Sequence, residues 1–309
     1  MKTAIVGAGS IGSLLAALLC KSKEEVWLLA KTEEEAKKIN ADGISVEGVS
    51  GNWQARVKAA SDPKDVQECG LVVVCVKAYD TKSAARAARQ MVAEEGVVLT
   101  LQNGMGNIEL LQDVVGQEKV IGGITNMGAV LLGAGKVRHA GKGDVVIGRL
   151  DGKVPVAMRA IRERFTRAGI ETKVSKEIRG ALWAKLLINA GINPLTAVTR
   201  LNNGSLVEIK EVRELMRQAV SEGARVAKRK RIKLAYEDPL AKVEAVCEAT
   251  ASNISSMLQD VLAKRRTEVE YINGFIVRQG QELGIPVPVN VVLLNLVKTI
   301  EASYDQTVE

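Results

Sequence analysis

Residues 3–12 read TAIVGAGSIG, a short apolar run followed directly by glycines at positions 7, 9 and 12. A G-x-G-x-x-G spacing between a strand and a helix is the fingerprint of dinucleotide-binding folds. Gly7 allows the tight turn, Gly9 lets the backbone approach a diphosphate, and Gly12 permits close helix packing. The helix N-terminus adds unpaired N–H groups. A glycine-rich turn without a ligand is the alternative, but we expect dinucleotide binding by Gly7, Ala8, Gly9, Ser10, Ile11 and Gly12.

Apolar runs alternate with amphipathic stretches along the first half of the chain. The predicted strands cover residues 2–6, 25–29, 71–76, 97–101, 119–124 and 170–173, and the predicted helices cover residues 11–20, 33–40, 81–93, 107–114 and 155–167. Several strands are apolar without alternation, as buried parallel strands are. This order predicts a doubly wound parallel sheet, the Rossmann fold. Glycine-rich alternation in residues 126–148 predicts antiparallel strands on one edge of that sheet.

Strand patterns disappear after about residue 174, and helical periodicity continues almost to the end. Turn sequences interrupt it at Asn202-Asn203-Gly204, Asp238-Pro239 and Gly284-Ile285-Pro286. A chain of 309 residues suits two domains. We predict an α/β protein with a dinucleotide-binding Rossmann domain over residues 1–173. An all-α substrate domain over residues 174–309 is expected to pack closely against it and form a cleft.

Composition excludes several classes of protein. The chain has 47% hydrophobic and 26% charged residues, as ordinary globular proteins do. The apolar stretch near the start is far shorter than the ~20 residues of a membrane span, and no signal peptide is recognisable. We therefore expect a cytoplasmic protein without a membrane partner. One histidine and four cysteines without a CxxC pair argue against a metal site and against a Ser-His-Asp triad.

The net charge is +7, and basic residues cluster at the end of a predicted helix over residues 208–233. The cluster contains Arg225, Lys228, Arg229, Lys230, Arg231 and Lys233. A mild excess of positive charge can attract an anionic small molecule or a nucleic acid. The basic cluster can also be the solvent-exposed face of a helix without a ligand. Aromatic residues make up only 3% of the chain, which leaves few platforms for base stacking. We expect no nucleic-acid partner.

The end of the second predicted strand bears on the choice of cofactor. NAD-binding folds usually place a carboxylate there, on the ribose 2′-hydroxyl. Here the strand ends Leu28-Leu29-Ala30-Lys31 without a carboxylate at its tip, and three glutamates follow in the next helix. Lys31 suits a 2′-phosphate, which favours NADP(H), although a solvated surface lysine is the alternative.

Two further polar positions follow predicted strands. Lys77 comes after residues 72–76, and Asn103 lies in the sequence QNGMG after residues 97–101. In an open α/β sheet these strand ends border the ligand crevice. Asn103 can offer amide donors and acceptors to a cofactor ribose or to a substrate. It can also cap the following helix, and the two roles are compatible.

The second half contains the stretch LWAKLLINAGINPLT at residues 182–196. Lys185 and Asn189 are four residues apart and share one helix face. Asn193 continues that line where Pro194 is expected to start a new helix. Buried polar side chains in this apolar setting need partners, although a lone helical lysine is usually solvated. A carbonyl that receives a hydride gains negative charge on oxygen, and Lys185 is the best candidate in the chain for the general acid.

Six blocks together resemble the 2-dehydropantoate 2-reductase (ketopantoate reductase) family over nearly the whole chain. They are GAGSIG at 7–12, VKAYDT at 76–81, QNGMG at 102–106, LWAKLLINAGINPLTA at 182–197, NISSMLQD at 253–260 and RTEVEYINGF at 266–275. The last three are the most specific. The resemblance implies NADPH-dependent reduction of ketopantoate to pantoate, in pantothenate and coenzyme A biosynthesis.

The resemblance also implies roles for individual residues. Lys185 corresponds to the catalytic proton donor, and Glu268 to a glutamate that contacts the cofactor and supports catalysis. Ser256 corresponds to the serine that holds the substrate carboxylate. Asn189, Asn193 and Asn203 correspond to substrate-binding asparagines, and Lys77, Asn103 and Ala129 to cofactor-site positions, with Asn103 also near the substrate. Some relatives have arginine where this chain has Lys31. Lysine has the same positive charge as arginine, but it lacks the planar guanidinium that can bind a phosphate through two hydrogen bonds at once.

Two other interpretations remain open at this stage. A paralogue with the same fold can act on another 2-keto acid, because a fold does not determine a substrate. A protein that senses NADP or binds nucleic acid through residues 225–233 would instead show steeply salt-dependent binding and no turnover. A homodimer is compatible with the sequence, which does not identify an interface.

Overall fold

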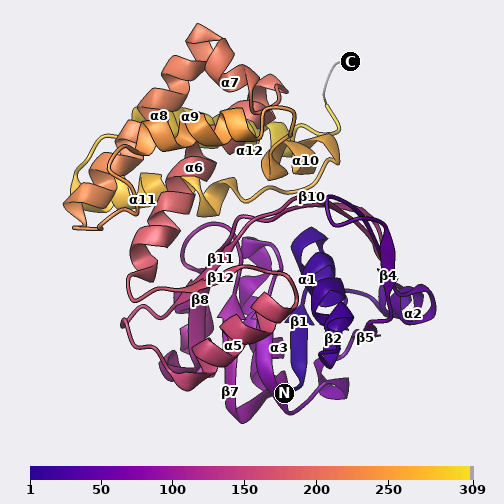
Figure 1. Cartoon of the computed structure of the whole chain (residues 1–309). Coiled ribbons are helices and arrows are strands. Elements are labelled where there is room, and N and C mark those ends of the chain that lie inside the picture. The colour runs from indigo at the N-terminus through magenta and orange to yellow at the C-terminus, as the bar shows by residue number, and fades with distance from the viewer. Residues whose placement is uncertain (307–309) are drawn as a thin grey trace. The chain divides into compact units, whose positions relative to one another are not determined.

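The computed structural model describes residues 1–306 (Figure 1). The chain divides into two compact units. The first unit contains residues 1–102 and 106–178, and the second contains residues 103–105 together with the chain from residue 179 onward. Each unit is described by itself.

An eight-stranded sheet forms the centre of the first unit, in the order β12-β11-β8-β7-β6-β1-β2-β5. The strands from β5 to β8 in this order run parallel, whereas β11 lies antiparallel to β8. The strands are β1 (Thr3–Val6), β2 (Val26–Leu29), β5 (Lys58–Ala60), β6 (Cys69–Val74), β7 (Val92–Thr100), β8 (Val120–Thr125), β11 (Val145–Gly148) and β12 (Thr172–Val174). The predicted α/β class with a mainly parallel sheet is confirmed.

Helices cover this sheet because the central strands are apolar on both faces. All four residues of β1 are buried, and so are five of the six residues of β6. The helices of the first unit are α1 (Ser10–Lys21), α2 (Glu33–Asp42), α3 (Thr81–Met91), α4 (Asn107–Val115) and α5 (Val156–Arg167). Short 3₁₀ turns lie at η1 (Pro63–Asp65), η2 (Ala78–Asp80) and η3 (Gln117–Lys119). Leu14 and Leu15 of α1 are fully buried in the resulting core.

A second, four-stranded sheet packs on α1, in the order β4-β3-β10-β9. Its strands are β3 (Ile44–Gly48), β4 (Trp53–Ala55), β9 (Gly128–Gly133) and β10 (Lys136–Gly141). Lys21, the last residue of α1, lies 4.2 Å from the ring centre of Trp53 in β4. The prediction that residues 126–148 form one sheet edge is therefore wrong in part. Strands β9 and β10 pair with the unpredicted β3–β4 hairpin, and only β11 joins the main sheet, between β8 and β12.

In the described residues from 179 to 306, the regular secondary structure of the second unit is all helical. Its helices are α6 (Ile178–Thr199), α7 (Ser205–Glu208), α8 (Lys210–Arg229), α9 (Pro239–Ala249), α10 (Ser256–Leu262), α11 (Asn273–Leu283) and α12 (Pro288–Ala302), with a 3₁₀ turn at η4 (Val269–Tyr271). Two details of the prediction are wrong. No new helix starts at Pro194, because α6 continues through this residue with its neighbours buried. The basic helix divides into α7 and α8 and ends at Arg229.

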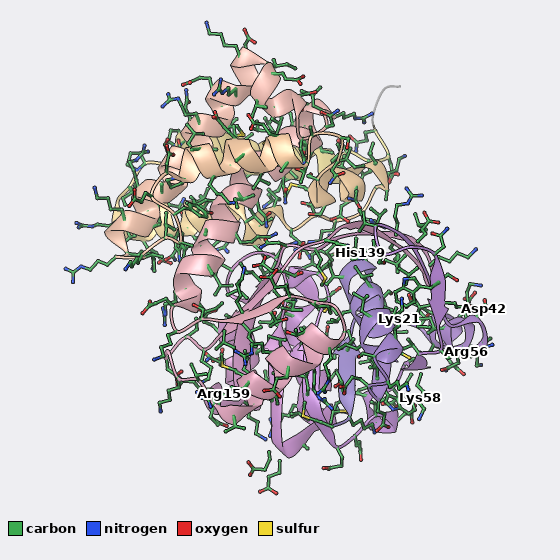
Figure 2. All side chains as sticks on the ribbon, viewed as in Figure 1. Lys21, Asp42, Arg56, Lys58, His139 and Arg159 are labelled. Carbon is green, nitrogen blue, oxygen red and sulfur yellow. The ribbon has the colours of Figure 1, made fainter. Side chains whose placement is uncertain are left out.

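His139 is a buried histidine whose protonation is expected to destabilise the fold in acid. The side chain lies on β10 (Figure 2) and is only 6% exposed, and burial lowers its pKa below the ordinary value of 6.5. As the pH falls below about 6.5, the unfolded chain therefore binds a proton before the folded protein does. We expect the free energy of unfolding to decrease between this pH and the lower pKa of the folded state, by at most about 1.4 kcal/mol per pH unit.

Urea unfolding of the wild type and of His139→Gln between pH 7.5 and pH 5 measures this effect. Because His139 is the single histidine of the chain, the difference between the two proteins isolates it. The wild type should lose stability more steeply than the variant as the pH falls. Equal slopes would show that the protonation of His139 does not contribute.

Candidate active site

The glycine-rich loop lies at the centre of the main sheet. The Gly7 N–H donates to the Leu29 carbonyl at the end of β2 (3.0 Å), and the Cys75 N–H donates to the Val6 carbonyl (2.9 Å). The loop thus leaves β1 where its neighbours change from β2 on one side to β6 on the other. Ligands of open α/β sheets bind at such a switch point. Gly7 has a φ of +109°, and a Cβ there would collide with Val76.

The loop and the start of α1 fit a diphosphate. Gly9 is the N-cap of α1, no side chain caps the helix, and the space that a Cβ would occupy at Gly9 is open. The N–H groups of the first turn, which begins with Ser10 and Ile11, are thus not taken by a capping side chain. Ala8 is buried, and its carbonyl accepts from the Ser13 hydroxyl (3.1 Å). A Cβ at Gly12 would collide with the Gly7 carbonyl, so this position requires glycine for packing.

The tip of β2 carries both a cation and a carboxylate. Lys31 is exposed, and its backbone N–H donates to Glu35 Oε2 (3.1 Å). Thr32 caps α2 by accepting from the Glu35 N–H (3.2 Å). The expectation of a strand tip without a carboxylate is therefore wrong. The arrangement resembles a capping box, except that Glu35 accepts from the N–H of Lys31 and not from that of the N-cap Thr32.

Lys77 lies at the same edge of the sheet. It follows the end of β6, is half-buried and precedes η2. The buried side chain of Gln102 holds this edge together, because its amide donates to the Val76 carbonyl (3.0 Å) and to Thr81 Oγ1 (2.8 Å). Ala129 lies instead on β9 of the second sheet, opposite His139 of β10.

Asn103 belongs to the second unit. The Met105 N–H donates to the Tyr271 carbonyl (3.0 Å), and Gly104, with a φ of +80°, lies so close that a Cβ would collide with Tyr271. The Asn189 side chain donates to Asn103 Oδ1 (3.3 Å). Because α4 begins after its N-cap Gly106, Asn103 is not the residue that caps it. The structure brings Asn103 together with α6 and with the segment that contains Glu268.

The predicted face of α6 is largely buried. Lys185 is half-buried, whereas Asn189 and Asn193 are 8% and 5% exposed. Lys185 and Glu268 both have polar or electrostatic partners, so neither is a free surface charge. Next to Lys185, the Ala184 carbonyl accepts from the Tyr236 hydroxyl (2.6 Å), and burial raises the pKa of this tyrosine.

Ser256 and Asn203 lie beside the C-terminal half of α6. Thr196 Oγ1 is 2.7 Å from Ser255 Oγ, which also caps α10 by accepting from the Leu258 N–H. Ser256, the next residue, is exposed and available to a ligand. The Asn203 N–H donates to the Asn253 carbonyl (2.9 Å), and its side chain is buried against Thr250. The segment before α10 thus connects these predicted substrate residues.

The loop that carries Glu268 is fixed by α12. The Thr267 N–H donates to Glu301 Oε1 (2.7 Å), and Arg265 forms an ion pair with the buried Asp260 (3.2 Å). The Tyr304 hydroxyl donates to the Arg265 carbonyl (2.7 Å), and burial raises its pKa to about 12. Glu268 itself is only 5% exposed. The backbone on the N-terminal side of Glu268 is therefore held by contacts from Glu301, Asp260 and Tyr304.

Sequence reasoning missed the residues that support the site. Thr196, Ser255, Tyr271 and Glu301 are not among the predicted site positions, yet each fixes a segment that carries one. Ser255 alone had a readable pattern, since a serine directly before a helix is a common N-cap. Thr196, Tyr271 and Glu301 act through contacts with residues that are distant in the sequence, and local sequence patterns do not predict such contacts.

Comparison with known proteins decides the family. Residues 3–152 match the ketopantoate reductase PanE/ApbA family, and residues 177–301 match its C-terminal domain, ketopantoate reductase PanE/ApbA C terminal. The chain belongs to the ketopantoate reductase family.

A 2-dehydropantoate 2-reductase of Archaeoglobus fulgidus is 40% identical over 96% of this chain and 97% of its own length. The crystal structure of a PanE/ApbA family ketopantoate reductase from Ralstonia eutropha is 37% identical, covers 99% of this chain and all of its own, and superposes with a TM-score of 0.90. D-mandelate dehydrogenase with NADH and anilino(oxo)acetate is 26% identical, with a TM-score of 0.91 over 99% of this chain and 100% of its own.

Two absences apply to the described part of the chain. Between residues 1 and 306 no helix is long and apolar enough to span a membrane. Within the same residues no three side chains of histidine, cysteine, aspartate or glutamate gather as a metal site would need.

Proposed function

We propose that this ketopantoate reductase family member reduces 2-dehydropantoate to pantoate with NADPH. One observation carries the proposal. Asn103, which follows the end of β7, is hydrogen-bonded to Asn189 one turn from Lys185 on the buried face of α6. Full-length similarity to proteins named 2-dehydropantoate 2-reductase supports the choice of substrate.

In this proposal the bound cofactor would supply a hydride to the ketone carbon. The residues of this chain bind the substrate, orient it and donate the proton. Lys185 donates a proton to the ketone oxygen, which completes the secondary alcohol. The exposed Ser256 hydroxyl binds the substrate carboxylate. The asparagines Asn189, Asn193 and Asn203 orient the substrate, and Glu268 contacts the cofactor and supports proton transfer.

The first unit binds NADP(H) in the same proposal. The N–H groups at Gly9, Ser10 and Ile11 hold the diphosphate, and Lys31 faces the 2′-phosphate. Lys77 and Ala129 are further cofactor-binding positions of this unit in the proposal, and Asn103 of the second unit is another. Residues 1–173 then form the dinucleotide-binding domain and residues 174–309 the substrate domain. The four free cysteines support a reducing, cytoplasmic location.

Steady-state oxidation of NADPH and of NADH with a panel of 2-keto acids tests the proposal. The panel contains 2-dehydropantoate, pyruvate and the keto acid that corresponds to mandelate. We expect the highest kcat/KM for 2-dehydropantoate with NADPH. A higher value for another keto acid would identify a paralogue of different specificity.

Glu35 is expected to weaken the preference for NADPH. Its carboxylate accepts from the Lys31 N–H, so it lies close to the place where a 2′-phosphate would meet Lys31. Glu35→Gln keeps a hydrogen-bond acceptor but removes the repulsive charge. At a few ångströms and in partly aqueous surroundings, this should tighten NADPH binding by about three- to tenfold.

Fluorescence titration of the free enzyme with NADPH and NADH measures the change without turnover. Glu34→Gln is the matched control, because this exposed residue of the same helix carries the same charge, whereas Glu35 is the residue that accepts from the Lys31 N–H. Only Glu35→Gln should alter the ratio of the two dissociation constants. The same shift in both variants would mean that net charge alone is responsible.

A further inference from the structure

Pro194 leaves a gap in the hydrogen bonding of α6. In a regular α-helix the carbonyl of residue 190 accepts from the N–H of residue 194. Proline has no N–H, and its ring crowds the carbonyl four residues earlier. Pro194 nevertheless lies inside α6, and Ala190 is fully buried. The Ala190 carbonyl therefore needs a donor from elsewhere, because a buried carbonyl without one is costly.

Asn273 supplies that donor. It is the first residue of α11 and is fully buried, and its side-chain amide lies 3.2 Å from the Ala190 carbonyl. The same amide donates to Asn290 Oδ1 (3.0 Å). Asn273 thus joins α6 to the beginning of α12 through one side chain.

The partner of Asn273 is itself held in place. Asn290 is fully buried and donates to the Ala219 carbonyl (3.0 Å) and to Glu222 Oε2 (2.8 Å). Glu222 is 3% exposed and accepts the N–H groups of Val289 and Asn290, both at 2.9 Å. A carboxylate at a helix N-terminus is favourable, and hydrogen bonds to a charged group are strong. The path from Glu222 to Ala190 therefore fixes the orientation of the Asn273 amide.

We infer that Asn273 is a positioning residue, which replaces the hydrogen bond lost at Pro194 and so holds Asn189 and Asn193 in place for the substrate. Asn189 precedes Ala190 directly, and Asn193 precedes Pro194, so both belong to the turn that the gap would loosen. Asn273 also follows the turn in which the Tyr271 and Ile272 N–H groups donate to the Glu268 carbonyl. One amide thus sets α6 against the Glu268 segment. The substrate part of this inference rests on the proposed function.

A double-mutant cycle tests the inference. Asn273→Leu removes the donor at similar volume, and Pro194→Ala restores an N–H to the helix. With 2-dehydropantoate, Asn273→Leu should raise KM by about tenfold, the scale expected when a binding side chain loses its support. In the Pro194→Ala background the same change should raise KM by less than about threefold. The dissociation constant for NADPH should change less than KM, because the proposed phosphate contacts lie in the first unit.

A control and a second variant keep the test decisive. Gln279→Leu, on the same helix, removes a buried side chain that contacts Glu282 and Lys230; it should lower stability without changing KM. If Asn273→Leu does not fold, Asn273→Ser takes its place. An equal rise of KM in both backgrounds, or a loss of stability without any rise, would overturn the inference.

Hydrogen exchange separates this inference from the proposed function. The backbone amides of residues 189–193 and 195–199 should exchange faster in Asn273→Leu than in the wild type, and Pro194→Ala should reverse much of the change. This measurement needs no substrate, so it stays valid if 2-dehydropantoate is not turned over. Unchanged exchange in Asn273→Leu would contradict the role of Asn273 even in an active enzyme.

Discussion

Lys185→Ala is expected to lower kcat for 2-dehydropantoate by ~10²–10⁴-fold, the usual contribution of a general acid. Lys185 lies one turn from Asn189 on α6. Asn189 and Asn193, on the same face of this helix, are buried. Without Lys185, the developing oxyanion loses both its proton donor and a cation of the proposed site. Binding of NADPH should change little, because the proposed phosphate contacts lie in the first unit.

Two further variants make this result specific. Lys185→Arg keeps the charge, but a guanidinium does not release a proton at neutral pH, so its activity should remain at least about 10²-fold below the wild type. Lys210→Ala removes an exposed lysine at the start of α8 and should leave kcat unchanged. Circular dichroism confirms folding in each case. Near-normal turnover of folded Lys185→Ala would exclude Lys185 as the acid.

Substitution of Gly9 and Gly12 is expected to separate cofactor binding from stability. At Gly9 the backbone is extended, with a φ of −74°, and a Cβ would point into open space. Gly9→Ala should therefore unfold at nearly the wild-type temperature. The added methyl group occupies the space where a diphosphate would approach the backbone, so NADPH binding should weaken by about tenfold or more.

Gly12→Ala should behave differently. The Cβ of an alanine at position 12 would collide with the carbonyl of Gly7. Because this carbonyl belongs to the backbone, it cannot rotate away as a flexible side chain could. Such overpacking typically costs about 1–3 kcal/mol, and the displaced loop should also bind NADPH poorly. Thermal unfolding and NADPH titration of both variants measure the contrast. Wild-type affinity in Gly9→Ala would show that the diphosphate binds elsewhere.

Most strands of the central sheet were predictable because they are short and apolar, whereas its edge strand β5 was not predicted. Strand β6, for example, reads Cys69-Gly70-Leu71-Val72-Val73-Val74, and its neighbour β1 is apolar and buried in the same way. The second sheet was not predictable from local patterns. Its β3 strand alternates over only five residues, and it is completed by β10, some ninety residues later in the chain. Long-range pairing of this kind leaves no sequence period.

Two predictions failed for different reasons, one through a tertiary contact and one through a local pattern that was overlooked. Proline normally ends a helix, but Asn273 supplies a donor to the carbonyl that Pro194 leaves open. A carboxylate at the tip of β2 was not expected, although Thr32-Glu33-Glu34-Glu35 has the spacing of a capping box. The latter error was avoidable from sequence, whereas the former required the position of α11.

The transfer of hydride to 2-dehydropantoate tests the central claim most directly. The enzyme is incubated with 2-dehydropantoate and NADPH that carries deuterium at both C4 positions, and the product is analysed by mass spectrometry and NMR. The account predicts pantoate with one deuterium on the carbon of the former ketone. Consumption of NADPH without labelled pantoate, or no consumption by folded enzyme that binds NADPH, would contradict it.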